Sequence, residues 1–237
     1  MKILFLHPNF PGQFKYVARS FARRGDEVKF LCQTHFGRNV PGVERICMKG
    51  PLSDERAETE SKGIPSDKSK IVGNQYRTAI QKLKTSGWIP DVVISHSGWG
   101  ASLHVKEIYS YCKHISYLEW WFGKEKYFLE SKQNQNWFNL RDRSFEKFWR
   151  RNETIALDLI NADEIICPSI WQHRQLPLIL KQKAKIIYDG LDLDFINNIE
   201  TAKSKYPLIT YGTRGMEPIR HFPEFIMQSR VLLDKSP

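Results

Sequence analysis

The sequence lacks the features that most readily assign a chain to a class. It contains no run of about 18 apolar residues, so no transmembrane helix is indicated. The apolar run at residues 3–6 is too short for a signal-peptide core. The four cysteines are far apart and form no Cys-x-x-Cys pair, which indicates neither a zinc site nor a disulfide framework. We therefore expect a cytoplasmic protein with reduced, buried thiols.

Positive charge is what the chain has in excess. Thirty-six Lys and Arg against 26 Asp and Glu give a net charge of +10. Such a surface attracts nucleic acid, anionic lipid or phosphorylated small molecules, or is simply solvated. The charge is scattered and no nucleic-acid motif is present, so we expect no nucleic-acid partner. A phosphorylated ligand and a peripheral contact with an anionic membrane stay open.

Strand-like and helix-like segments alternate along the whole chain. Short apolar runs predict strands at residues 2–7, 27–32, 92–96, 114–118, 164–167, 185–188 and 208–211. Helical spacing predicts helices at 12–24, 71–85, about 100–109, about 140–161 and 222–233, and a short helix capped at 168–169. Segments 50–70 and 189–206 read as connections. The fold class is α/β, a Rossmann-like parallel sheet with helices on both faces.

The loops that follow the first and third predicted strands could bind a ligand, because open parallel sheets bind ligands at the carboxyl ends of their strands. Gly12 follows the first strand and opens a helix, where a phosphate can approach free N–H groups. The same glycine would also suit a tight turn, and no dinucleotide fingerprint is present. His96 ends a later strand, before a glycine-lined loop, and can donate to a substrate oxygen or shuttle a proton. A structural histidine is the alternative.

Two further segments suit a sugar nucleotide. Glu119 with Trp120 offers a carboxylate for sugar hydroxyls beside a ring for stacking, although Trp120 could equally anchor the next loop. Arg214 and Arg220 surround a turn ahead of a helix and form a plausible pyrophosphate clamp, because guanidinium binds phosphate oxygens bidentately. Two solvated arginines are the alternative.

Several motifs occur in a fixed order along the chain. Residues 7–14 read His-Pro-Asn-Phe-Pro-Gly-Gln-Phe. Further motifs occupy residues 90–94, 96–100, 117–121, 162–164, 168–172 and 188–192. This ordered set resembles the retaining glycosyltransferases of family four, which have the GT-B fold of two facing Rossmann-like domains.

The resemblance implies a domain organisation. Residues 1–188 would form the N-terminal acceptor-side domain, residues 189–206 the interdomain hinge, and residues 207–237 the first βα unit of a truncated C-terminal donor-binding domain. The family's pair of glutamates eight positions apart is missing. We therefore expect the isolated chain to be inactive or poorly active.

The resemblance also implies site residues. Gly12 would face the donor phosphates, His96 would contact the transferred sugar, and Arg214 with Arg220 would clamp the pyrophosphate, so no metal or other cofactor is expected. We expect further sugar or acceptor contacts from Gln13, Gly98, Trp99, Glu119 and Trp120. The chain departs from the family pattern by Asp189 for asparagine, Arg220 for the commoner lysine and His221 for glycine.

The implied activity is sugar transfer with retention, of hexosyltransferase type. The donor would be a nucleoside diphosphate sugar, and the acceptor a hydroxyl on a glycan, a lipid-linked sugar or a small molecule. The alternative is a non-catalytic module that binds a glycan or a protein. Such a module would bind its partner without nucleotide-dependent turnover.

Overall fold

The computed structural model describes residues 1–48, 62, 65–122, 149–191, 193–198, 208–213, 216 and 220–234. Two compact units are present. The first comprises Met1–Gly123 with Phe145–Asp192, and the second comprises Lys124–Ser144 with Leu193–Pro237. No helix in the described ranges is long and apolar enough to cross a membrane.

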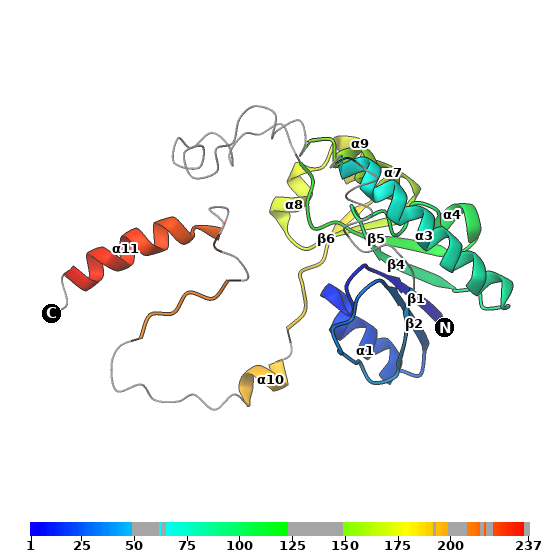
Figure 1. The fold of residues 1–237 in the computed structure, drawn as a ribbon, viewed down its shortest axis with the longest axis horizontal. Coiled ribbons are helices and arrows are strands. Elements are labelled where there is room, and N and C mark those ends of the chain that lie inside the picture. Colours follow the sequence, from blue (N-terminus) through cyan, green and yellow to red (C-terminus); the bar gives the residue numbers. More distant parts are fainter. Residues whose placement is uncertain are drawn as a thin grey trace. The chain divides into compact units, whose positions relative to one another are not determined.

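The first unit is built on one parallel sheet (Figure 1). Its strands are β1 (Lys2–Leu6), β2 (Glu27–Cys32), β3 (Val43–Cys47), β4 (Val92–His96), β5 (Lys113–Tyr117), β6 (Glu164–Cys167) and β7 (Ala184–Ile186). Their order is β3-β2-β1-β4-β5-β6-β7, and every neighbouring pair is parallel. This arrangement confirms the predicted Rossmann-like α/β fold.

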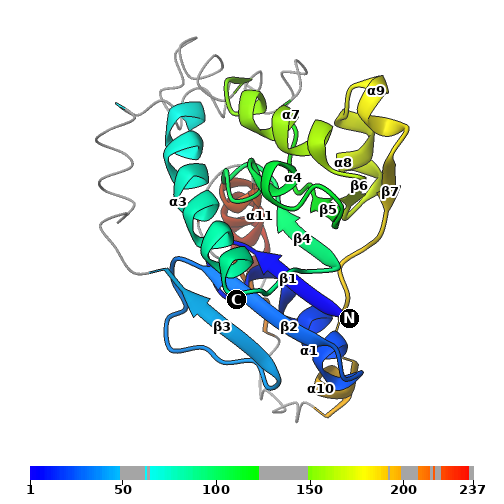
Figure 2. The ribbon, with the colours of Figure 1, turned by 90° about the vertical axis from the view of Figure 1, so that its right-hand side faces the viewer.

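Helices cover both faces of this sheet (Figure 2). The helices in the described part of the first unit are η1 (Gly12–Phe14), α1 (Lys15–Arg23), α3 (Pro65–Thr85), α4 (Val105–Ile108), α7 (Asn152–Asn161), α8 (Ile170–Gln175) and α9 (Leu178–Lys181). The hydrophobic core has one part on each face of the sheet, because successive side chains of a strand such as β1 point to opposite faces. Leu4 packs with Tyr76 of α3, and Phe5 packs on the opposite face with Phe14. Each such buried side chain contributes about 1.5–3 kcal/mol.

Some predicted boundaries needed correction. Strand β3 was not predicted, because Val43–Cys47 is a half-exposed edge strand with two charges among its five residues. Residues 65–70 were expected in a loop but belong to α3. The helix expected over about 100–109 is reduced to α4, since Gly98 and Gly100 have φ of 89° and 82° and the chain stays in turns up to residue 104.

The predicted helix over about 140–161 lies partly outside the described residues, which contain α7 from Asn152 to Asn161. The predicted short helix with its serine cap is confirmed, because Ser169 Oγ accepts a hydrogen bond from the Gln172 N–H. All four cysteines are free, and three of them are buried, while Cys47 is partly exposed.

The second unit contains α10 (Leu193–Asn197), within the expected connection, and α11 (Phe222–Asp234), where a helix was predicted. The strand predicted at residues 208–211 is wrong. These residues pair with no strand in the described part of the chain, and a strand needs such a neighbour to satisfy its N–H and C=O groups. Instead, the Tyr211 ring stacks on Phe225 at 4.6 Å. His221 has φ of 56°, a conformation that glycine adopts without strain.

Candidate active site

Three neighbouring strands of the first unit end at the same edge of the sheet. Leu6 of β1 is paired in register with Ser95 of β4, and His96 at the end of β4 is paired with Tyr117 of β5. The residues that follow these strand ends therefore lie next to one another. Open parallel sheets bind ligands at this edge.

His7 follows β1 and is held neutral. Its Nδ1 accepts a hydrogen bond of 2.8 Å from the Asn9 N–H, so the proton of the neutral ring lies on Nε2. Burial, reinforced by the neighbouring His96, lowers the pKa of His7 to about 3. The two imidazoles meet edge to face at 5.1 Å. His7 was not among the predicted site residues, although its place at a strand end was a sufficient signal.

His96 presents one nitrogen to the edge of the sheet. Its side chain is 5% exposed, and Nδ1–H donates to the Ser97 carbonyl at 2.8 Å. A carbonyl oxygen only accepts, so Nδ1 carries a proton and Nε2 is the atom available for chemistry. Nε2 lies 3.2 Å from Glu119 Oε2 and 3.4 Å from Gln13 Nε2.

Gln13 completes a polar cluster with His96 and Glu119. Its Nε2–H donates to Glu119 Oε2 at 3.1 Å. Three predicted site residues, which come from the end of β4 and from the segments after β1 and β5, are thus within hydrogen-bonding distance of one another. Because the Glu119 side chain is half-exposed while His96 is buried, the cluster has one open side.

Gly12 has a structural reason to be glycine. Its φ is 52°, and an added Cβ would lie 3.0 Å from the His7 ring. Any other residue here would push on the ring that packs against His96. Gly12 begins η1, a three-residue turn that leads into α1.

The predicted aromatic residues fall into two groups. Trp99 is 48% exposed, and its ring lies 6.4 Å from His96 and 6.5 Å from His7. Trp120 packs instead against Trp171 of α8, with ring centroids 4.9 Å apart. Trp99 is therefore the predicted aromatic residue that lies beside the two histidines, whereas Trp120 packs against α8.

Tyr117 connects the site to residues that were predicted to form a hinge. Its hydroxyl donates to both carboxylate oxygens of Asp189, at 3.0 and 3.2 Å. The ring lies 5.3 Å from His96. Burial, with the Asp189 charge as the next cause, raises the pKa of Tyr117. No local sequence signal joins positions 117 and 189.

The predicted arginine pair is only partly described. Arg214 lies outside the described residues. Arg220 belongs to the second unit, where its backbone carbonyl accepts a hydrogen bond from the Tyr211 hydroxyl. The role of both residues as a clamp stays a prediction.

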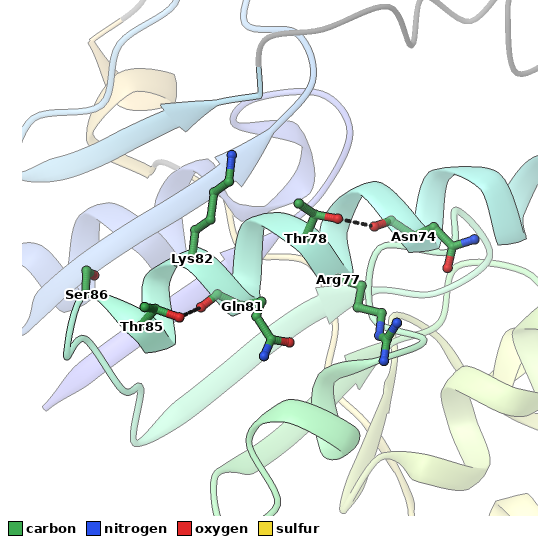
Figure 3. Close-up of a pocket in the computed structure, with 7 residues that line it drawn as sticks. All are labelled: Asn74, Arg77, Thr78, Gln81, Lys82, Thr85 and Ser86. Carbon is green, nitrogen blue, oxygen red and sulfur yellow. Dashed lines mark hydrogen bonds between the residues drawn. The ribbon is translucent and has the colours of Figure 1, made fainter.

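A groove of about 710 Å³ lies elsewhere on the first unit (Figure 3). It is lined by polar side chains of α3 from Asn74 to Thr85 and by Ser86 just after the helix, and Arg77 among them is paired with Glu107. None of the predicted site residues lines it.

Several solved structures share the fold of this chain. Similar folds include Os79 from O. sativa in complex with UDP, with 12% identity and a TM-score of 0.53 over 90% of this chain and 60% of that chain. The catalytic domain of starch synthase IV from Arabidopsis thaliana, bound to ADP and acarbose, has 13% identity and a TM-score of 0.50 over 81% and 52%. Phytolacca americana UGT2 with UDP-2fluoro-glucose and pterostilbene has 10% identity and a TM-score of 0.50 over 83% and 56%.

At these identities the likeness shows the fold alone, which is that of GT-B glycosyltransferases. The chain spans little more than half the length of these structures. No curated protein matches the sequence.

The family model of the glycosyl transferase family 4 group matches residues 24–196, well over half of the chain. The chain belongs to this glycosyltransferase group.

Proposed function

We propose that this chain carries the acceptor side of a retaining glycosyltransferase of hexosyltransferase type. The donor is a nucleoside diphosphate sugar, and the acceptor is a hydroxyl of a glycan, a lipid-linked sugar or a small molecule. One observation carries the proposal: Gln13, His96 and Glu119 meet at the carboxyl edge of the sheet in a member of this family.

The geometry gives each of these residues a role. Because Nδ1 of His96 is occupied by the Ser97 carbonyl, Nε2 faces the transferred sugar and donates to, or accepts a proton from, a sugar hydroxyl. The Glu119 carboxylate accepts from an acceptor hydroxyl, and Gln13 orients that carboxylate. Trp99, next to this cluster, offers a ring face on which a sugar can stack.

The donor half of the proposal rests on the resemblance. Gly12 faces the donor phosphates, and Arg214 with Arg220 stabilises the negative charge that develops on the departing nucleoside diphosphate. Such a clamp needs no metal ion. The net charge of +10 suits an anionic donor. A cytoplasmic location belongs to the same proposal and is supported by the four free thiols.

The test is a transfer assay on the protein encoded by the whole reading frame, with a panel of nucleotide sugars. His96→Ala should lower turnover by about 100-fold or more, since it removes the group that moves protons at the sugar. Lys82→Ala, in the α3 groove, is the matched control and should leave turnover unchanged. Glycan binding without release of nucleoside diphosphate would favour the non-catalytic binding module instead.

A further inference from the structure

One peptide group joins a buried carboxylate to the site histidine. Asp158 of α7 accepts a hydrogen bond from the Gly98 N–H at 3.2 Å. The carbonyl of the same peptide unit belongs to Ser97, and it accepts the Nδ1–H of His96 at 2.8 Å. The N–H and the C=O of a planar trans peptide point in opposite directions, so the carboxylate lies behind this amide and the imidazole in front of it.

The Asp158 carboxylate is buried, and each of its oxygens accepts a hydrogen bond. Asp158 is 0% exposed, and its second oxygen accepts from Ser102 Oγ at 3.0 Å. Helix α3 holds the other side of Gly98, because Ser69 Oγ donates to the Gly98 carbonyl at 3.2 Å. The loop after β4 is thus held by side chains from two helices that are distant in sequence.

We propose that Asp158 is a positioning residue for His96 and acts through the Ser97–Gly98 peptide group. By holding the Gly98 N–H, the carboxylate fixes the plane of the amide, which keeps the Ser97 carbonyl on Nδ1 and leaves Nε2 toward the ligand. A negative charge behind the amide also polarises it, so that the carbonyl accepts the imidazole proton more strongly. The consequence for sugar transfer rests on the proposed function, whereas the effect on the imidazole does not.

Asp158 changes its charge near neutral pH, which makes the coupling measurable there. Burial raises the pKa of Asp158 to about 7, opposed by the hydrogen bonds from Gly98 and Ser102. Within the described ranges, no charged side chain contributes to this shift. Around the imidazole, the titratable neighbours are His7, Tyr117 and Glu119. Of these, burial keeps His7 and Tyr117 in one protonation state near pH 7.

The first test is Asp158→Asn, followed by ¹⁵N NMR of the His96 ring in the ligand-free chain. The amide oxygen can still accept from Gly98, and the amide NH₂ can donate to the Ser102 hydroxyl, so shape and hydrogen bonding are retained without the charge. The midpoint of the His96 titration should fall by about one pH unit. The Nδ1–H tautomer should also become less populated. An unchanged midpoint and tautomer would overturn the proposal.

Ser102→Ala is the matched control, because it removes the other hydrogen bond to Asp158 but keeps the charge and the bond to Gly98. At about pH 9, above the pKa of Asp158, the His96 nitrogen shifts should equal those of the unmodified chain. If Asp158→Asn and Ser102→Ala change the His96 nitrogen shifts equally, both variants only loosen the loop, and this result would contradict the proposal.

A titration of the unmodified chain decides the question if Asp158→Asn does not fold. The ¹³C shift of the Asp158 carboxyl and the ¹⁵N shifts of His96 should show a common inflection. If the carboxyl titrates and the imidazole shifts do not respond, Asp158 does not act on His96. Because no sugar is involved, a protein that shows the coupling but transfers no sugar would refute the proposed function alone.

Discussion

At the residue scale, the site depends on two adjacent histidines that hydrogen-bond in opposite ways. Nδ1 of His7 accepts from a backbone N–H, while Nδ1–H of His96 donates to a backbone carbonyl. The two rings therefore hold their protons on different nitrogens, although they meet at 5.1 Å. One ring is a neutral packing partner, and the other offers Nε2 to a ligand.

The low pKa of His7 predicts a loss of stability in acid. The unfolded chain takes up a proton at His7 near pH 6.5, but the folded chain does so only near pH 3. The contribution of His7 to stability is therefore complete above about pH 6.5 and is lost as the pH falls toward about 3, by about 1.4 kcal/mol per pH unit. His7→Gln keeps an acceptor for the Asn9 N–H without a titrating group, so its unfolding free energy should fall less steeply.

Urea denaturation at several pH values measures this difference. His114, whose pKa burial lowers to about 4, is present in both proteins and cancels in the comparison. Parallel pH profiles for the unmodified chain and His7→Gln would show that His7 takes up a proton in the folded state as readily as in the unfolded state.

Gly12 and Gly25 form a matched pair for a second prediction. Both have positive φ, but a Cβ at Gly12 would meet the His7 ring at 3.0 Å, whereas a Cβ at Gly25 would meet nothing within 4 Å. Gly25→Ala should cost about 1 kcal/mol for the backbone alone. Gly12→Ala should cost about 1–3 kcal/mol more because it also displaces a buried ring. Chemical denaturation compares the two variants, and equal losses would contradict the contact with His7.

At the scale of elements, strands with continuous apolar runs were the most predictable. The limits of β2, β4 and β6 match the predicted ranges, because buried parallel strands leave a strong hydrophobic signal. The charged edge strand β3 leaves no such signal. The residues after Gly100 favour a helix, but the glycines at 98 and 100 keep the chain out of a helix there. This difference from the prediction results from close packing rather than from local propensity. An alanine Cβ at Gly100 would lie 1.9 Å from the Ser69 carbonyl oxygen.

The part of the site that lies at the ends of neighbouring strands could be predicted from the sequence. His96 ends β4, Glu119 follows β5, and Gln13 lies in η1, the first turn after the loop that follows β1, so reading the segments at neighbouring strand ends was enough to group them. Asp158 and Asp189 reach the same region from distant parts of the chain. Their contacts depend on how α7 packs and on where the chain passes after β7, and no motif in the sequence encodes either.

The hydrogen bond that caps helix α8 leads to a prediction about the free energy of unfolding. Ser169 Oγ accepts from the Gln172 N–H, one of the N–H groups that a helix start leaves unpaired. Ser169→Ala should lower the unfolding free energy by about 1 kcal/mol, and Ser169→Asp should restore it, since aspartate caps equally well. Thermal unfolding checks both variants. A Ser169→Asp variant no more stable than Ser169→Ala would show that the cap contributes nothing.

At the scale of the whole molecule, the family model places the chain in a glycosyltransferase group, while the reaction and the roles of the site residues are proposed. The chain covers 52% to 60% of the solved structures it resembles. The cluster of Gln13, His96 and Glu119 lies within the first compact unit, and Arg220 lies within the second. The central claim is therefore that the His96 cluster acts on a sugar that a nucleotide delivers.

The most direct measurement is the release of nucleoside diphosphate coupled to acceptor glycosylation, in the protein encoded by the whole reading frame. The unmodified protein and Lys82→Ala should turn over alike with at least one nucleotide sugar, and His96→Ala should lose about 100-fold or more of that rate. Full turnover in His96→Ala would contradict the assignment of the site. Absence of turnover with every nucleotide sugar, with glycan binding retained, would contradict the assignment of the reaction.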